Sequence, residues 1–295
     1  MKNAAFIYNP SSGDQSIAQK LDFIIEKFQH RGVLLHPCRL RDINEERILE
    51  ILGQCKYDFI VISGGDGTLN SIINTLLKNN ISIPLGIIPS GTCNDLARCL
   101  NIPNDLKQCL DIILGDNLID VDVCQAGNDK YFLSTCAGGL FVDASFDTHN
   151  ELKKNFGPFA YYLKAISEIA NLKSFHLKIT TEKDVIEDDV FLFLISNGKH
   201  AAGFQNIIMD ADFSDGLMDI VLIKNCSHVD LAGLFFKVLS NESLTDKNVI
   251  KIRANHCLIE SNNNIILSLD GEKWEPLPQE IRVCHQGLQV FVKEQ

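Results

Sequence analysis

The chain has 295 residues, of which 45% are hydrophobic and 22% are charged, a composition typical of ordinary folded globular proteins. This length is enough for two domains of roughly 100 to 200 residues each, and it excludes small folds that depend on disulfides. The 27 basic and 38 acidic residues give a net charge of −11, which argues against a nucleic-acid partner, because the phosphate backbone would repel the protein.

The first part of the chain alternates short apolar runs with helical stretches. The apolar runs are Ala4–Tyr8, Val33–Pro37, Phe59–Ser63 and Pro84–Ile88. This alternation predicts a Rossmann-like α/β domain, in which crossover helices connect the strands of a parallel sheet.

After Asp122 the pattern changes to strand runs with few helices. The runs are Tyr131–Cys136, His176–Thr181, Val190–Ser196, Leu217–Ile223, Ile265–Leu269 and Ile281–Cys284, and the helices are Ala160–Leu172 and His228–Leu239. This pattern predicts a mainly antiparallel β-sandwich. We place the α/β domain at residues 1–123 and the β-rich domain at 124–285, and residues 286–295 could return to the first domain.

A glycine-rich turn follows the third apolar run. Gly64 and Gly65 precede Asp66, Gly67 and Thr68, and a helical stretch comes next. Such a turn lets phosphate oxygens approach backbone N–H groups at the start of a helix. Because phosphate would repel the Asp66 carboxylate unless a divalent cation lay between them, the motif indicates magnesium–nucleotide chemistry. A plain strand-to-helix turn with Asp66 as a helix cap remains the alternative.

Two further polar loops follow predicted strands. Asn9–Gly13 comes after the first strand, and residues 89–98, with the sequence PSGTCNDLAR, come after the fourth. Since the carboxyl ends of parallel strands share one edge of a sheet, all three loops are expected to open onto one ligand crevice.

The motifs NPSSG, GGDGTLN, PSGTCNDLAR and SLDGE occur in this order over nearly the whole chain. Together they resemble the lipid kinases that share the diacylglycerol kinase catalytic domain. The resemblance implies that ATP and Mg²⁺ are the cofactors. It implies an ATP site formed by Asn9, Pro10, Ser11, Ser12, Gly13, Gly65, Asp66, Gly67, Thr68, Leu69, Asn70, Ser71 and Thr92.

The same resemblance implies roles for four acidic residues. Asp66 would engage magnesium through water, and Asp95 and Asp122 would organise the interdomain cleft. Glu272 would be the general base, because a carboxylate beside an alcohol can accept its proton during phosphoryl transfer. From the residues alone, the neighbouring Asp270 and Gly271 are typical of a hairpin turn.

The segment from Asp212 to Leu217 resembles the structural magnesium loop of that family. The implied ligands are the Asp215 carboxylate and the carbonyl groups of Asp212 and Leu217. A second Asp-Gly hairpin turn is the alternative.

The chain differs from the usual family pattern at several positions. A lysine is replaced by Asp14, a glutamate by Ser71 and a proline by Met209, and the expected threonine is missing from Cys38-Arg39-Leu40. Because Asp14 reverses a charge close to the expected triphosphate, nucleotide contacts are expected to differ while the fold is retained.

A lipid kinase must reach a bilayer, and residues 152–178 carry five lysines interleaved with aromatic residues. This segment could form an interfacial helix that contacts anionic lipid, with Phe235, Phe236 and Lys237 as a second candidate. A surface helix with its aromatic side chains in the core is the alternative. The oligomeric state stays open, with a homodimer among the options.

The ten cysteines form no C-x-x-C pair and lie mostly in apolar surroundings, as is typical of reduced thiols. No apolar run approaches the roughly 20 residues of a membrane-spanning helix. We therefore expect a cytoplasmic protein that contacts the inner face of the membrane peripherally.

These observations predict an ATP- and magnesium-dependent lipid kinase that phosphorylates a lipid hydroxyl, with diacylglycerol as the expected substrate. A NAD kinase, or a kinase of another small alcohol, is one alternative, since such enzymes carry motifs similar to GGDGT. A weakly active regulator that binds nucleotide or lipid is the other, motivated by Asp14 and Ser71.

Overall fold

The structure is a computed structural model, which describes residues 1–13, 15–40, 44–139, 173–198, 212–240, 242 and 244–294. The chain divides into two compact units, and each is described by itself. Unit 1 comprises Met1–Asp122 and His285–Gln295, and unit 2 comprises Val123–Cys284. Two strands, β5 (Leu118–Ala126) and β15 (Gln279–Phe291), contain residues of both units.

Unit 1 contains a parallel sheet with strand order β4-β3-β1-β2. The strands are β1 (Lys2–Tyr8), β2 (Val33–Arg39), β3 (Phe59–Gly64) and β4 (Leu85–Pro89). Strands β3 and β4 are buried along their whole length, as expected for a sheet that is covered on both faces. From β1 the chain first adds β2 on one side and then crosses to add β3 on the other side. In sheets of this kind, a ligand crevice usually lies at the carboxyl ends of the strands where the direction changes, here between β1 and β3.

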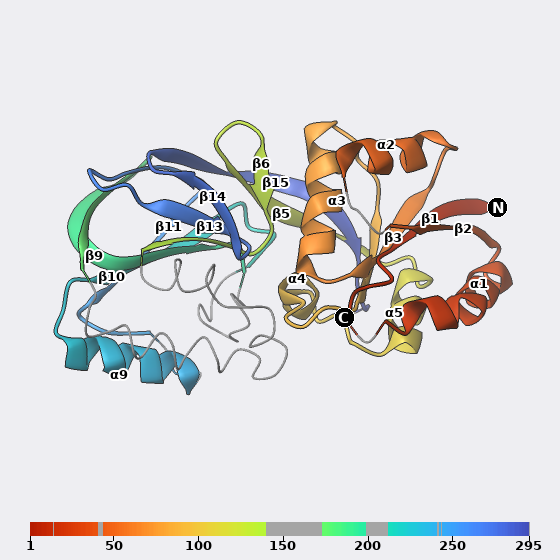
Figure 1. Cartoon of the computed structure of the whole chain (residues 1–295), viewed down its shortest axis with the longest axis horizontal. Coiled ribbons are helices and arrows are strands. Elements are labelled where there is room, and N and C mark those ends of the chain that lie inside the picture. The colour runs from red at the N-terminus through yellow and green to blue at the C-terminus, as the bar shows by residue number, and fades with distance from the viewer. Residues whose placement is uncertain are drawn as a thin grey trace. The chain divides into compact units, whose positions relative to one another are not determined.

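Helices cover both faces of this sheet (Figure 1), α2 and α3 on one and α1 and α5 on the other. The helices are η1 (Ile17–Lys20, a 3-10 helix), α1 (Leu21–His30), α2 (Glu45–Gly53), α3 (Asp66–Lys78), α4 (Asp95–Cys99) and α5 (Leu106–Ile113). Side-chain caps fix two of the starts. Asn44 accepts the N–H of Arg47 at the start of α2, and Asp105 accepts the N–H of Gln108 at the start of α5.

The end of β15 adds a strand to the sheet of unit 1. Val290 lies beside Leu85 of β4 in parallel register. The ring of Phe291 packs edge-on against the ring of Phe59, with 5.3 Å between centroids, and Phe59 in turn stacks on Phe28 of α1. The last residues of the chain therefore contribute to the core of the first unit.

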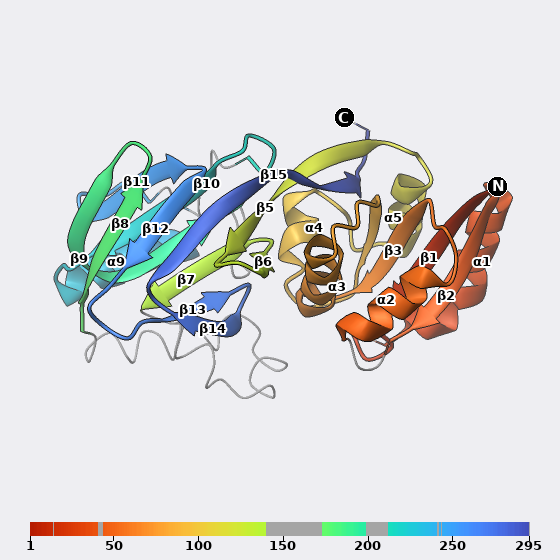
Figure 2. The same cartoon turned by 90° about the horizontal axis from the view of Figure 1, so that it is seen from above.

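Unit 2 is an antiparallel β-structure (Figure 2). Its other strands are β6 (Lys130–Phe132), β7 (Thr135–Gly139), β8 (Phe175–Thr181), β9 (Val185–Ser196), β10 (Met218–Lys224), β11 (Val249–Ala254), β12 (His256–Glu260), β13 (Ile266–Leu269) and β14 (Glu272–Pro276). One helix, α9 (His228–Leu239), follows β10. The first half of β9 pairs with β8, and its second half lies between β7 and β10.

The predicted fold class is confirmed: an α/β first part with parallel strands, and a second part that is an antiparallel β-sandwich. Three predicted strands differ clearly from those in the structure. The strand expected at Val190–Ser196 begins five residues earlier, at Val185. Tyr131–Cys136 is interrupted at Leu133 and Ser134, because their N–H groups bond to the side chain of Asp270 instead of a neighbouring strand. The strand expected to end at Cys284 continues to Phe291.

All ten cysteines are free thiols, as predicted, but only four are buried: Cys109, Cys124, Cys136 and Cys257. Burial raises the pKa of Cys109 and of Cys257 to about 12, so both remain protonated at neutral pH. The other six are half-buried, and the prediction of buried thiols is wrong for them.

Several predictions fall outside the described residues. They concern the helix at residues 160–172, nearly all of the basic aromatic segment at 152–178, and the departures at Asp14 and Met209. In the part of the chain that is described, no helix combines the length and the apolar character needed to cross a bilayer.

Candidate functional site

Three loops at the carboxyl ends of β1, β3 and β4 meet in unit 1. Gly13, with a φ of +56°, presses against the carbonyl of Ser90, which leaves no space for a side chain. Gly65 and Gly91 are also in backbone contact, since a Cβ on Gly91 would lie 2.6 Å from the Cα of Gly65. Glycine is therefore required at all three positions, and the three loops form one surface of exposed backbone.

The loop after β4 is held by Asn94, which is buried and adopts a left-handed conformation with a φ of +53°. Its side-chain oxygen accepts the N–H of Gly91 at 2.8 Å, and its side-chain nitrogen donates to the carbonyl of Gly91 at 3.0 Å. Asparagine tolerates this left-handed conformation, and its side chain makes both of the hydrogen bonds that close the loop. These hydrogen bonds within the loop hold its shape and do not depend on a ligand.

The Asp66 carboxylate joins the two glycine loops. Its two oxygens accept the N–H groups of Asn94 and Asp95, each at 2.8 Å, so Asp66 caps α4 from a position 28 residues earlier in the chain. Burial raises the pKa of Asp66, opposed by these two hydrogen bonds and by the charge of Arg98. Asp66 does not cap the helix that it begins, as the alternative supposed, because Gly65 is the N-cap of α3 and no side chain bonds there; it caps α4 instead. A carboxylate whose charge burial disfavours would also gain from a nearby cation.

Several of the predicted site residues that follow Asp66 have buried side chains on α3. Leu69 and Asn70 are buried on α3, where Asn70 accepts a hydrogen bond from Asn74 at 3.0 Å. Their side chains face the protein interior, so any contact they make with a ligand is through the backbone. Thr68 is buried as well, and its hydroxyl lies 3.5 Å from the side-chain nitrogen of Asn9, which links the first loop to α3.

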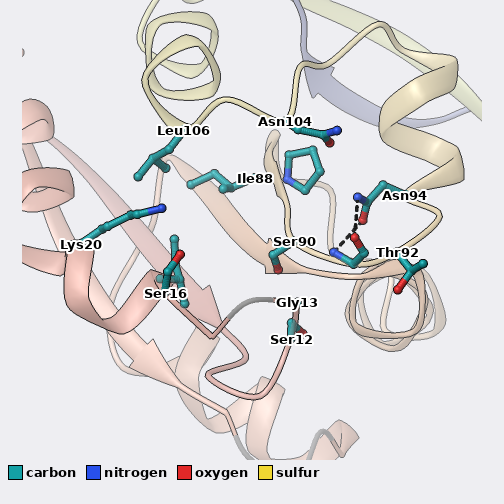
Figure 3. Close-up of a pocket in the computed structure, with 13 residues that line it drawn as sticks. Ser12, Gly13, Ser16, Lys20, Ile88, Ser90, Thr92, Asn94, Asn104 and Leu106 are labelled. Carbon is teal, nitrogen blue, oxygen red and sulfur yellow. Dashed lines mark hydrogen bonds between the residues drawn. The ribbon is translucent and has the colours of Figure 1, made fainter. Parts of the chain in front are cut away.

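A cavity of about 250 Å³ opens beside these loops (Figure 3). Its polar lining includes Ser12, Ser16, Lys20, Ser90, Thr92 and Asn104. Only Ser12 and Thr92 among these six were predicted as site residues from the sequence. Lys20 and Asn104 belong to no motif.

Asp122, at 1% exposure, is a buried carboxylate in β5. Its Oδ1 accepts the Nδ1–H of His285 at 2.8 Å and the N–H of Gln286 at 2.7 Å. The imidazole of His285 is half exposed, so Asp122 fixes the orientation of a ring that also reaches solvent. Sequence reasoning missed His285, because 163 residues separate it from Asp122.

In unit 2, Glu272 lies in a β-hairpin between β13 and β14. Asp270 and Gly271 form the turn, as the residues alone indicate, with φ angles of +48° and +84°. The Glu272 carboxylate is 58% exposed and lies 3.7 Å from the ammonium group of Lys130, which also stacks over Trp274. The half-exposed Glu272 carboxylate is available to a ligand.

Asp270 fixes the position of this hairpin. Its carboxylate accepts three backbone N–H groups, those of Leu133, Ser134 and Thr135, at 2.7 to 2.9 Å. Two of these donors, Leu133 and Ser134, interrupt the predicted strand at 131–136, and the third, Thr135, begins β7. Asp270 therefore determines where Glu272 lies.

The predicted metal loop forms a tight turn whose carboxylates have protein partners. Asp212 accepts the N–H and the hydroxyl of Ser214, and Asp215 accepts the N–H of Leu217. The guanidinium group of Arg253 lies 2.6 Å from the other oxygen of Asp215, where it supplies a positive charge. Among the described residues, no group of three or more His, Cys, Asp or Glu side chains could hold a metal ion.

The structure thus brings together, within unit 1, Asn9–Gly13, Gly65, Asp66, Thr92 and Asp95. Asp122 and His285 form a separate pair in the same unit. Glu272 and the loop at residues 212–217 belong to unit 2.

Comparison with known families and proteins agrees with this arrangement. Residues 3–126 match the family model of the diacylglycerol kinase catalytic domain. Residues 138–292 match that of the YegS C-terminal NAD kinase beta sandwich-like domain.

Whole-chain relatives give the same result. The chain is 30% identical over 291 residues to a diacylglycerol kinase of Staphylococcus aureus, and the aligned region covers 98% of this chain and 92% of that protein. One from Staphylococcus epidermidis is 29% identical over 295 residues, with the same coverage. A Bacillus anthracis crystal structure, provisionally assigned as a diacylglycerol kinase, superposes with a TM-score of 0.84 at 26% identity, covering 99% of this chain and 95% of that one. The chain therefore belongs to the diacylglycerol kinase family of lipid kinases.

Proposed function

We propose that this protein uses ATP and Mg²⁺ to phosphorylate a lipid hydroxyl, with diacylglycerol as the expected acceptor. The observation that carries this proposal is the contact between the two glycine loops, where Gly65 meets Gly91 and the Asp66 carboxylate accepts the N–H groups of Asn94 and Asp95. Glycine loops at the starts of helices, with a carboxylate beside them, suit a triphosphate whose charge is shared with a divalent cation.

In the proposed reaction, the loops of unit 1 hold the triphosphate by their backbone N–H groups. Asp66 would engage the magnesium ion through water, and the ion, when bound, would spread the charge of the phosphate oxygens. Asp95 would help to organise the cleft. The Glu272 carboxylate accepts the proton of the lipid hydroxyl while the hydroxyl oxygen bonds to the γ-phosphorus. The bond between the γ-phosphorus and the bridging oxygen breaks, and ADP leaves.

The metal part of this proposal predicts how chelation affects ATP binding. In the wild-type protein, ATP affinity is expected to fall at least roughly tenfold when EDTA removes magnesium, because Asp66 then repels the phosphates. Asp66→Asn should reduce this dependence to within about threefold, since the repelling charge is gone. Calorimetric titration of ATP with and without EDTA measures both effects. Wild-type binding that ignores the chelator would contradict the role of the ion.

The substrate is tested with radiolabelled ATP and a panel of alcohols: diacylglycerol, phosphatidylglycerol, sphingoid bases, undecaprenol and NAD. We expect label in the organic extract, with diacylglycerol giving the fastest transfer. Label confined to the aqueous phase with NAD would replace this proposal with a NAD kinase. Tight ATP binding without turnover on any acceptor would indicate a binding protein.

We further propose peripheral contact with a membrane. Helix α9 supports this, because Val229 and Phe236 are 81% and 59% exposed and lie seven residues apart, on one side of the helix. The sequence also proposed Phe235 and Lys237 as membrane contacts, but neither side chain is available on this side of the helix. Phe235 is buried, and Lys237 pairs with Asp246 at 3.1 Å. Of the three residues predicted to contact a membrane, Phe236 is therefore the one that this proposal keeps.

A further inference from the structure

Lys130 pairs with the Glu272 carboxylate in unit 2. It begins the short strand β6, whereas Glu272 begins β14, far later in the chain. The Nζ atom of Lys130 lies 3.7 Å from Oε2 of Glu272. The side chain of Lys130 is only 19% exposed, while that of Glu272 is 58% exposed. The carboxylate therefore has a largely buried cation on the protein side and solvent on the other.

The ring of Trp274 holds the Lys130 side chain in place. The ammonium group lies over this ring, 5.7 Å from its centroid. Trp274 is partly buried and packs against the hydrophobic core of unit 2. A cation over an indole face gains roughly 0.5 to 2 kcal/mol, so the ring favours one position of the lysine. Lys130 therefore presents its charge to Glu272 from a well-defined place.

The backbone fixes both ends of this pair. Lys130 belongs to the antiparallel ladder between β5 and β6, and Glu272 to the ladder between β13 and β14. Directly after β6, the N–H of Leu133 donates to the Asp270 carboxylate in the hairpin turn, at 2.7 Å. Because this hydrogen bond ties β6 to the turn that carries Glu272, the separation of the two backbones does not depend on the ion pair.

A fixed cation limits the conformations of an exposed glutamate. Glutamate has several rotatable side-chain bonds, and restricting them costs roughly 1.5 to 2 kcal/mol of conformational entropy. The charge of Lys130 favours the conformers that bring the carboxylate toward β6. Their separation of 3.7 Å exceeds the roughly 3.2 Å of an ordinary N–H···O hydrogen bond, so the carboxylate oxygens keep lone pairs for a hydroxyl donor.

We propose that Lys130 is a positioning residue for phosphoryl transfer, whose ammonium group holds the Glu272 carboxylate in the orientation that accepts the proton of the lipid hydroxyl. This inference rests on the proposed function, because Lys130 acts through Glu272 as the base. The proton passes from the hydroxyl to Glu272, and Lys130 itself exchanges none. Lys130 has no contact with the lipid in this proposal.

The test measures single-turnover transfer of labelled phosphate from ATP, with magnesium, to diacylglycerol in detergent micelles. Lys130→Met removes the charge and keeps an apolar stem, so the maximum rate should fall roughly 5- to 20-fold. The half-saturating concentrations of ATP and diacylglycerol should change less than about twofold. Lys130→Arg should stay within about threefold of the wild-type rate, because arginine also stacks on an indole ring and pairs with a carboxylate.

Lys224→Met is the matched control. It removes the same charge from another lysine of unit 2, which pairs with Asp188 at 2.9 Å, and it should leave the rate unchanged. Trp274 is the only tryptophan in the sequence, so its fluorescence reports on the Lys130 site alone. Lys130→Met should change this emission, and Lys224→Met should not. An unchanged spectrum in Lys130→Met would contradict the stacking on which the proposal depends.

Combining Lys130→Met with Glu272→Gln separates positioning from any other role. If Lys130 acts through Glu272, the second change adds less than about twofold to the loss in Glu272→Gln. The proposal is overturned if the two losses multiply, or if Lys130→Met alone transfers phosphate as fast as the wild type. A wild-type rate in Glu272→Gln would overturn the proposed base and this inference with it. A slow Glu272→Gln beside a fast Lys130→Met overturns the positioning role alone.

Discussion

Replacing Glu272 with glutamine is expected to slow phosphoryl transfer by at least roughly 100-fold, while ATP affinity changes less than about twofold. An amide has nearly the size of a carboxylate, but it cannot take up the proton of the attacking hydroxyl. Because the Glu272 side chain is 58% exposed and its ion pair with Lys130 is long, at 3.7 Å, the change should barely affect stability. The lost activity would therefore reflect the missing proton acceptor and not unfolding of the protein.

Single-turnover transfer of labelled phosphate to diacylglycerol measures this effect, and calorimetry measures ATP binding. Glu275→Gln is the control, since it makes the same change three residues further along β14 at another exposed position. It should keep near wild-type rates. Equal rates in Glu272→Gln and the wild type would remove Glu272 from the mechanism.

The second large effect is structural. We expect Asp270→Ala to lower the free energy of unfolding by roughly 3 to 5 kcal/mol, because it leaves three backbone N–H groups without an acceptor. The donors belong to Leu133, Ser134 and Thr135, all at most 8% exposed, so water can replace the carboxylate only in part. Activity should fall as well, because the hairpin that carries Glu272 loses its attachment.

Urea denaturation followed by circular dichroism provides the measurement. Asp270→Asn retains one oxygen acceptor and should lose about half as much stability. Asp188→Ala is the surface control. It breaks an ion pair with Lys224 and should cost about 1 kcal/mol or less. An unchanged unfolding midpoint for Asp270→Ala would show that the three hydrogen bonds contribute nothing net.

The parts of the fold that sequence predicts well are those with a local signal. Strands β3 and β4 are continuous apolar runs that end in glycine turns, so both the elements and the loops follow from neighbouring residues. Strand β14 was missed because all of Glu272–Pro276 except the partly buried Trp274 is exposed, so the run has no alternating apolar pattern. The break at residues 133–134 could not be foreseen, since its cause is Asp270, more than 130 residues later.

The candidate site shows the same division. The glycines and Asp66 belong to motifs and were found, although the bonds from Asp66 to residues 94 and 95 could not be. Lys20 and His285 are single residues without a motif, and only folding brings them to a cavity or to a partner carboxylate. The roles proposed for Glu272 and for the loop at 212–217 remain predictions.

The final strand also affects the order in which the protein can mature on the ribosome. Val290 and Phe291 complete the sheet that begins with residue 2, and the N–H of Val292 donates to the carbonyl of Asn117. The first unit therefore lacks one strand and a core aromatic ring until these residues have been synthesised. The glycine loops acquire this support only after residues 290–292 have been synthesised, so a chain that stops before them would carry every motif of the candidate site on an incomplete scaffold.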